Sequence, residues 1–362
     1  MQTGSRREFI KGAGIAAASV AASSLMTPAA EAQGSKIAMS SGAIPRRPLG
    51  KTGAEVSALG MGGHHLGDAK IEDEAVRMVH EAVDEGITFF DNCWEYHNGR
   101  SEEWLGKGLE GRRDRVFLMT KVCTHGRDKE LALKMLEDSL RRLKTDHLDL
   151  WQIHAISYDN DPELAFKTGG VIEALDQAKK DGKVRFLGFT GHKDPAFHLK
   201  MLTYKYPFDT VQMPLNPFDS HFRSFQKMVL PELHRQGIAA LGMKSLSGTA
   251  DPVKRGVITA EEGLRYAMSL PVAVTISGMD SLEVLRQNLA IAHNFKPMSS
   301  EEIRLLERRC APASTDGHLE LYKVSLKYDN PQTRRPHGFP LDGKQKEVQE
   351  MFAPKESSVD SL

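Results

Sequence analysis

The stretch Ile87-Thr88-Phe89-Phe90-Asp91-Asn92-Cys93-Trp94-Glu95-Tyr96 determines how the rest of the chain is interpreted. It opens with apolar and β-branched residues after Gly86 and ends in a polar turn, a pattern typical of a buried strand. The predicted strand ends on Asp91, and Tyr96 follows shortly after it. Two interpretations are open from this stretch alone. Asp91 caps the next helix and Tyr96 packs at its rim, or both side chains enter a reactive site.

The sequence around this stretch alternates between strand and helix patterns. The strand candidates are Ala58 to Met61, Thr88 to Asp91, Val116 to Lys121, Leu148 to His154, Val184 to Thr190, Thr210 to Met213, Ile238 to Met243 and Val272 to Ser277. The helix candidates are Asp73 to Asp84, Ser101 to Leu109, Lys129 to Leu143, Val171 to Lys180, Pro195 to Lys205, Phe222 to Arg235, Ala260 to Ser269 and Ser281 to His293. Strands that each precede a helix, over roughly 250 residues, predict an α/β fold, the TIM (β/α)8 barrel.

A doubly wound open sheet is the competing fold. The glycine spacing of its dinucleotide-binding turn is matched only by Gly106-Lys107-Gly108-Leu109-Glu110-Gly111. That segment ends a predicted helix and precedes a predicted strand, which is the reverse of the context that the turn requires. The barrel is therefore favoured.

The first residues have the pattern of an export signal. Ser5-Arg6-Arg7 precedes an apolar, alanine-rich run from Gly12 to Met26, and small residues up to Ala32 form a cleavage site. This arrangement resembles a twin-arginine signal, and an uncleaved membrane anchor is the alternative. The resemblance implies the twin-arginine export machinery as a partner, a periplasmic or otherwise exported protein, and no stable membrane insertion after cleavage.

The domain organisation follows from these patterns. We expect a signal peptide at residues 1–32, a linker at 33–45, the barrel at 46–300 with a short hairpin from Arg46 to Ser57, and a C-terminal extension at 301–362. From Cys310 onward the alternation fails, and we expect an extended arm that lies on the barrel.

Composition narrows the classes of function. Acidic and basic residues balance at 48 each, so the chain lacks the basic footprint of nucleic-acid binding and a polybasic membrane patch. Its cysteines, Cys93, Cys123 and Cys310, are too few and too scattered for a disulfide framework. Cys93 and Cys123 either pair or remain buried thiols. The expected partner is a small molecule in a concave site.

Four polar side chains fall where consecutive predicted strands end, which is where barrel enzymes place their chemistry. They are Asp91 and Tyr96 after the second strand, Lys121 at the end of the third and His154 at the end of the fourth. A lysine beside a tyrosine favours the phenolate and lowers its pKa, and a carboxylate holds the lysine in place. The set therefore suits proton delivery to a carbonyl oxygen that His154 also contacts. A nicotinamide would supply the missing hydride.

At this point the chain resembles the aldo-keto reductase family from about Arg46 to Asn288. The motifs that carry the resemblance are Arg47-Pro48-Leu49-Gly50-Lys51-Thr52-Gly53, Phe90-Asp91-Asn92 with Tyr96, Ser101-Glu102 with Leu105-Gly106, Thr120-Lys121, Leu148-Asp149-Leu150 with Gln152-Ile153-His154, and Val211-Gln212 with Asn216. The resemblance implies a carbonyl or alcohol oxidoreductase in which Asp91, Tyr96, Lys121 and His154 form the catalytic tetrad.

The resemblance also implies a cofactor site, and this chain departs from the family there. The positions expected to contact the cofactor are Thr190, Gly191, His192, Gln212, Met243, Lys244, Gly278, Met279, Gln287 and Asn288. Met243 stands where an aromatic ring usually covers the nicotinamide. Gly278 and Val284 stand where members selective for NADP often have a cation. The expected cofactor is NADP or NAD.

Several histidines also follow predicted strands. We expect His64, His125 and Trp94 to line a substrate pocket for a carbonyl or alcohol. A metal-dependent hydrolase is one alternative because histidine is a common metal ligand, although His64 and His65 are adjacent rather than alternating. We expect no metal. Another alternative is an exported barrel that binds a sugar-like ligand or holds its cofactor tightly, without turnover of free NAD(P)H.

Overall fold

The computed structural model describes residues 42–123, 128–325 and 328. Its first elements are β1 (Arg46–Pro48) and β2 (Glu55–Ser57), which pair antiparallel as the predicted hairpin. Leu49 and Val56 from this hairpin are buried in one hydrophobic cluster with Phe89 and Phe117 from the barrel interior. The hairpin therefore covers the end of the barrel where the strands begin.

The predicted barrel is confirmed. Its parallel strands are β3 (Leu59–Gly62), β4 (Phe89–Asp91), β5 (Phe117–Val122), β6 (Leu148–Ile153), β7 (Val184–Thr190), β8 (Thr210–Pro214), β9 (Ala239–Met243) and β10 (Val274–Gly278). They pair in chain order, and β10 closes the ring on β3 in register from Thr275 with Leu59 to Gly278 with Gly62. Because all the strands run in one direction, their carboxyl ends meet at one mouth.

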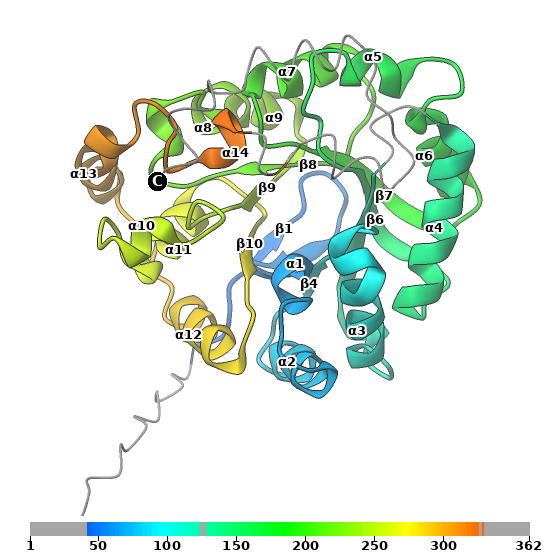
Figure 1. Ribbon diagram of the computed structural model, residues 1–362, viewed down its shortest axis with the longest axis horizontal. Coiled ribbons are helices and arrows are strands. Elements are labelled where there is room, and N and C mark those ends of the chain that lie inside the picture. Colours follow the sequence, from blue (N-terminus) through cyan, green and yellow to red (C-terminus); the bar gives the residue numbers. More distant parts are fainter. Residues whose placement is uncertain (1–41, 124–127, 326–327, 329–362) are drawn as a thin grey trace, which may run out of the picture. The chain divides into compact units, whose positions relative to one another are not determined.

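Helices surround this ring, as Figure 1 shows for α2, α3, α4 and α6. The longer helices are α2 (Glu72–Asp84), α3 (Arg100–Gly108), α4 (Lys129–Leu143), α6 (Val171–Lys180), α7 (Pro195–Thr203), α9 (Leu230–Gln236), α11 (Ala260–Ser269), α12 (Leu282–His293) and α13 (Ser300–Cys310). The shorter ones are α1 (Gly63–Leu66), α5 (Asp161–Phe166), α8 (Phe225–Met228), α10 (Asp251–Lys254) and α14 (Leu321–Val324). One predicted helix, Phe222 to Arg235, is divided into α8 and α9. Pro231 explains the division because it has no backbone N–H and therefore begins a helix more readily than it continues one.

The core has two layers. Phe89, Met119, Leu150, Leu241 and Val274 point into the barrel and fill it. A larger cluster lies between the outer faces of the strands and the buried stripes of the helices. A TIM barrel is thus packed through its centre, which leaves the mouth as the place for chemistry.

The C-terminal extension differs from the expected extended arm. In its described part, α13 is followed by a short 3₁₀ turn (Ala311–Ala313) and by α14. Figure 1 shows α14 beside α8. Lys323 and Glu320, on and just before α14, are fully buried, although both are charged residues that usually face solvent.

The structure also bears on two other expectations. In the described part of the chain, no helix is both long enough and apolar enough to span a membrane. Cys93, Cys123 and Cys310 are buried free thiols, so Cys93 and Cys123 do not form a disulfide. The expected signal peptide lies outside the described residues, as does most of the expected linker.

Candidate active site

The four residues predicted to act together do meet at the barrel mouth. Asp91 is the last residue of β4, Lys121 lies near the end of β5, and His154 follows β6. Tyr96 begins a 3₁₀ turn (Tyr96–Gly99) just after β4. The Lys121 Nζ lies 3.2 Å from the Tyr96 hydroxyl, and the Tyr96 and His154 rings meet edge to face at 5.8 Å.

Lys121 is the central charge of this set and is 1% exposed. Its Nζ donates to Asp91 Oδ1, to the Asn92 carbonyl at 2.8 Å and to the Tyr96 hydroxyl at 3.2 Å. A buried ammonium is tolerated when a carboxylate and hydrogen-bond acceptors surround it. The three contacts therefore fix the ammonium directly beneath the phenol.

The direction of the Tyr96 pKa differs from the sequence-based expectation. Burial raises this pKa well above its usual value, and the Asp91 carboxylate raises it further. The expectation of a lowered pKa was wrong, because burial of the phenol and the Asp91 carboxylate outweigh the Lys121 ammonium at 3.2 Å. Tyr96 therefore holds its proton at neutral pH and is poised as an acid.

Sequence reasoning missed Glu95. Its Oε1 lies 2.7 Å from Nδ1 of His154, and its Oε2 accepts a hydrogen bond from the Cys123 thiol at 2.8 Å. The Cys93 Sγ also lies 3.3 Å from the same Nδ1. A carboxylate at Nδ1 selects the tautomer with its proton on that nitrogen. The only signal in the sequence was an acidic residue immediately before the catalytic tyrosine.

The loop that carries Tyr96 has an unusual backbone. His97 and Asn98 have left-handed φ values of 52° and 56°, and Gly99 has φ 95°. The His97 Nε2 donates to the His64 carbonyl at 2.9 Å, and the His64 ring packs edge-on against Tyr96 at 5.2 Å. These contacts tie the loop to α1, so the position of the phenol is set from two sides.

The three residues predicted to line the substrate pocket, His64, Trp94 and His125, differ in where the structure places them. His64 lies beside Tyr96, as described. The Trp94 indole is directed toward α4, where Nε1 lies 3.4 Å from Asp138 Oδ2 and the Arg142 guanidinium lies 5.3 Å from the ring centroid. His125 lies outside the described residues. The role of all three as pocket walls stays a prediction.

Two of the predicted cofactor contacts, Thr190 and Gln212, lie at the ends of β7 and β8. The Thr190 hydroxyl accepts from the Ala155 backbone N–H at 3.1 Å and retains its own proton for another partner. Gln212 is 1% exposed, and its Nε2 lies 3.6 Å from the Met243 Sδ. Its Oε1 is buried without a hydrogen-bond partner in the described part of the protein. An unsatisfied buried acceptor of this kind fits a ligand amide.

Gly191 and His192 follow Thr190 directly. A Cβ on Gly191 would lie 2.5 Å from the Ile156 carbonyl oxygen, so only glycine fits this close approach. His192 is 7% exposed, and its ring packs against Tyr322 at 5.8 Å. Burial lowers the His192 pKa well below its usual value, so this ring is neutral at pH 7.

The predicted phosphate end of the cofactor site has little positive charge of its own. Gly278 lies beneath the His65 ring, which a Cβ there would meet at 2.1 Å. Met279 is fully buried, the Asn288 side chain donates to Ser277 at 3.0 Å, and Gln287 is exposed. Arg286, the nearest arginine in sequence, forms a two-pronged pair with Glu81 on α2 at 2.6 and 2.9 Å. Its guanidinium is therefore already occupied.

Two groups of potential metal ligands occur among the described residues. His64, His65 and Asp68 form one, and Cys93, Glu95 and His154 form the other. In the second group the 2.7 Å separation between Glu95 and His154 is a hydrogen-bond distance. The Glu95 carboxylate and the His154 ring are therefore joined by a hydrogen bond in that group.

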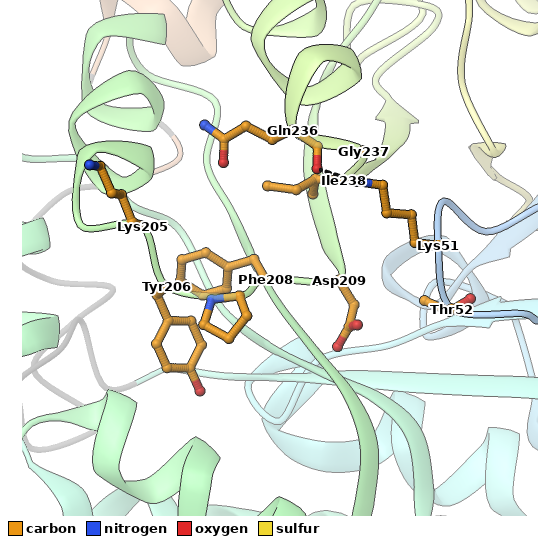
Figure 2. Close-up of a pocket in the computed structure, with 10 residues that line it drawn as sticks. Lys51, Thr52, Lys205, Tyr206, Phe208, Asp209, Gln236, Gly237 and Ile238 are labelled. Carbon is orange, nitrogen blue, oxygen red and sulfur yellow. Dashed lines mark hydrogen bonds between the residues drawn. The ribbon is translucent and has the colours of Figure 1, made fainter.

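A separate hollow of about 320 Å³ lies between β8, β9 and the hairpin, at the strand starts (Figure 2). Three of its polar side chains already have hydrogen-bond partners. Lys51 donates to the Gln236 carbonyl at 3.2 Å, Asp209 accepts from the Leu187 backbone N–H at 2.9 Å, and Tyr206 donates to Asp176 at 2.5 Å. In TIM barrels this end contributes stability, and chemistry belongs to the other end.

Comparison with known proteins agrees with this geometry. Residues 58–252, more than half of the chain, match the model of the aldo/keto reductase family. L-galactose dehydrogenase from Arabidopsis thaliana is 32% identical over 60% of this chain and 68% of its own length. The oxidoreductase YqkF from Bacillus subtilis is 26% identical over 72% of this chain and 95% of its own.

A solved structure shows the same fold. An aldo/keto reductase from Klebsiella pneumoniae, determined in complex with NADP and acetate, aligns with a TM-score of 0.60 and 24% identity over 73% of this chain and 95% of that one. The family model and the relatives favour an oxidoreductase over the metal-dependent hydrolase that the histidines had left open.

Proposed function

Because the chain belongs to the aldo/keto reductase family and is an NAD(P)-dependent oxidoreductase, we propose that Tyr96 is its general acid and base. The proposed reaction transfers a hydride between a nicotinamide and a carbonyl or alcohol substrate at the mouth of the barrel. The observation that carries the proposal is the contact of the Tyr96 hydroxyl with Lys121, which is itself paired with Asp91.

A bound nicotinamide would supply the hydride, which none of the four side chains can carry. In the direction of reduction, the carbonyl carbon gains the hydride and the carbonyl oxygen takes the proton of the Tyr96 hydroxyl, so the product is an alcohol. The Lys121 ammonium at 3.2 Å stabilises the phenolate that forms. Asp91 keeps the ammonium in place throughout. Alcohol oxidation runs through the same steps in reverse.

His154 has a role that depends on its charge. Because the Nδ1–H of His154 donates to Glu95, the other ring nitrogen of a neutral His154 is an acceptor and suits the hydroxyl of an alcohol substrate. Donation to a carbonyl oxygen requires the doubly protonated ring, whose positive charge Glu95 balances. The sequence alone predicts only the donor role for His154, and the contact with Glu95 supports both roles.

The residues present fit a nicotinamide. The unsatisfied Oε1 of Gln212 would accept from the carboxamide, with the Thr190 hydroxyl beside it. The residues expected near the extra phosphate of NADPH indicate only a weak selectivity between NADPH and NADH. Gly278 and Val284 offer no charge, and Arg286 is paired with Glu81. We therefore infer that the enzyme accepts both NADPH and NADH, with less than about tenfold preference for NADPH, whereas a dedicated charged contact to the extra phosphate would give more.

The proposal includes the compartment. Ser5-Arg6-Arg7 and the apolar run after it support export by the twin-arginine route, which places the mature enzyme in the periplasm or outside the cell. Determination of the N-terminal residue of the protein recovered from its source tests this part. A start after Ala32 supports export, and an intact N-terminus on cytoplasmic protein refutes it.

Cofactor titration tests the central part of the proposal. NADPH and NADH are added separately to the mature protein, and tryptophan fluorescence is followed together with oxidation of the cofactor by an aldehyde. We expect micromolar binding of both and consumption of both. Failure of both to bind would refute the nicotinamide assignment, and binding without hydride transfer would refute the assignment of carbonyl chemistry to the tested substrates.

A further inference from the structure

Lys244 is a cation at the barrel mouth that the proposed proton relay does not use. It follows β9 directly, is only partly exposed and has a left-handed φ of 56°. Among the described residues, no carboxylate and no hydrogen-bond acceptor pairs with its Nζ. The Nζ instead faces two aromatic rings, at 5.3 Å from the Tyr322 ring centroid and 4.9 Å from that of Tyr328. Sheltering an ammonium from water is costly unless an anion compensates it.

The aromatic wall is held by a buried polar network in the C-terminal extension. Lys323 Nζ contacts Asp219 at 2.7 Å and Glu320 at 2.8 Å, and all three side chains are at most 1% exposed. Glu320 in turn accepts from the Tyr322 hydroxyl at 2.5 Å, to which Asn216 also donates at 3.0 Å. The ring of Tyr322 is thus fixed against Lys244.

The partly exposed Lys244 and the buried Lys323 differ in what surrounds them. Lys323 has two carboxylates, and Lys244 has none among the described residues. The space for a carboxylate near Lys244 is taken by rings and by the backbone of Gly248, where an added Cβ would lie 3.7 Å from the Lys244 Nζ. In the described part of the protein, the Lys244 ammonium is therefore enclosed by aromatic rings and backbone, and no carboxylate contacts it.

Other titratable groups near Lys244 do not supply the negative charge. Burial lowers the pKa values of His64, His65 and His192, so these rings are neutral at pH 7 and can donate or accept hydrogen bonds. Among the described residues, the carboxylate in the field of Lys244 is that of Asp91, which already pairs with Lys121. The groups that face Lys244 are Asp91, Lys121, His64, His65, His192, Tyr322 and Tyr328.

We propose that Lys244, walled by Tyr322 and Tyr328, is a binding subsite for an oxyanion of the ligand that reacts at Tyr96. The ligand group is a carboxylate or a phosphate, because these are the biological anions that a sheltered ammonium binds by charge-assisted hydrogen bonds. The proposal rests on the proposed function, since the ligand is either the substrate or the dinucleotide of that reaction. It gives the C-terminal extension, which lies beyond the family match at residue 252, a role in binding.

The same chemistry has two possible sources, which one pair of variants distinguishes. Lys244→Met removes the charge at nearly constant volume, and Lys244→Arg retains it. Lys183→Met is the matched control because Lys183 lies at the opposite end of the barrel, just before β7, and pairs with Glu137. For each protein the dissociation constants of NADPH and NADH are measured, together with KM for 4-carboxybenzaldehyde and for the neutral 4-methylbenzaldehyde.

If the subsite binds the substrate, Lys244→Met raises KM for the carboxylated aldehyde roughly 10- to 100-fold, as expected for a lost charged hydrogen bond, while KM for the methyl aldehyde and both dissociation constants change little. If the subsite binds the diphosphate of the dinucleotide, the dissociation constants of NADPH and NADH both rise by that factor in Lys244→Met. The KM values for the two aldehydes then change by the same amount. In either case Lys244→Arg recovers most of the loss and Lys183→Met matches the wild type. Unchanged values for all four ligands in Lys244→Met would overturn the proposal.

A second measurement keeps the test independent of turnover. Inorganic phosphate at constant ionic strength should raise the melting temperature of the wild-type protein and of Lys183→Met, and not that of Lys244→Met. Equal stabilisation of all three proteins would also overturn the subsite. If the wild type shows the phosphate effect but transfers no hydride, the proposed function fails and the anion subsite stands.

Discussion

The two sides of the barrel mouth treat charge in opposite ways. On the side of β4, β5 and β6, Lys121 is paired with Asp91, and His154 is paired with Glu95. On the side of β9 and β10, Lys244 has no carboxylate among the described residues. The first side is complete before a ligand arrives, which is what preorganised catalysis requires. The second side is completed by the ligand, which is what selective binding requires.

This contrast separates rate from affinity. Substitutions on the paired side should lower the rate of hydride transfer and change ligand binding little. Substitutions on the unpaired side should do the reverse. Variants of Tyr96, Glu95 and Lys244 test this division between rate and affinity.

Tyr96→Phe should have the largest effect. Removing the hydroxyl removes the proton that the carbonyl oxygen receives, so hydride transfer should slow by about 1,000-fold or more. The dissociation constants of NADPH and NADH should stay within about twofold, because the phenol lies on the paired side. Stopped-flow single-turnover kinetics and a fluorescence titration measure the two quantities. A rate within tenfold of the wild type would remove Tyr96 from the mechanism.

Lys323→Met should have the largest effect on stability. It leaves Asp219 and Glu320 buried without their shared cation, and loss of one partner from such a network costs about 3 to 5 kcal/mol. The free energy of unfolding is measured with urea. Arg304→Met is the matched control, since its pair with Glu301 on α13 is exposed and should contribute little to stability. Equal effects of the two changes would contradict the buried network.

Glu95→Gln tests the residue behind His154. The amide cannot balance the charged ring, so we expect kcat for aldehyde reduction to fall by roughly 10- to 100-fold while KM changes little. Glu95→Asp should recover part of the rate if the charge matters, and it should not if only the length of the side chain matters. Glu110→Gln, on the surface and paired with Lys144, is the control. A change confined to KM would assign Glu95 to binding instead.

The pH dependence of anion binding should be the smallest effect. Burial lowers the Lys244 pKa to about 8. The ammonium is charged below that pH and neutral above it, so affinity for an anion should fall by about tenfold between pH 7 and pH 9. Neighbouring groups do not obscure this change, because burial places the pKa values of His64, His65 and His192 below the interval and that of Tyr322 above it. Sulfate binding is measured across this interval, because the charge of sulfate is constant between pH 7 and pH 9, and Lys244→Arg is the control that retains its charge. A flat profile for the wild type would contradict the assignment.

The fold and the grouping of Asp91, Tyr96, Lys121 and His154 could be predicted from the sequence, because both depend on patterns within short segments of the chain. Each barrel strand was located within two residues of its observed bounds, as for Val184–Thr190, because buried parallel strands are short apolar runs with clear ends. The carboxyl ends of such strands meet, so Asp91, Lys121 and His154 could be brought together without knowledge of the tertiary structure.

What the sequence could not provide depends on contacts between distant segments. The raised pKa of Tyr96 was not predicted, because the sequence does not show that the phenol is buried beside the Asp91 carboxylate. Glu95 was missed because its role depends on the position of His154, far along the chain. The C-terminal network was hidden for the same reason, since Asp219 and Lys323 are 104 positions apart in the sequence and no pattern pairs them.

The measurement that tests the central claim most directly is isotope transfer. Reduced nicotinamide cofactor that carries deuterium in place of both C4 hydrogens is incubated with 4-methylbenzaldehyde and with the wild-type or the Tyr96→Phe protein, and the product alcohol is examined by mass spectrometry and NMR. The account predicts one deuterium on the carbinol carbon, formed by the wild type and about 1,000-fold more slowly by the variant. An alcohol without deuterium, or equal rates for the two proteins, would contradict hydride transfer assisted by Tyr96.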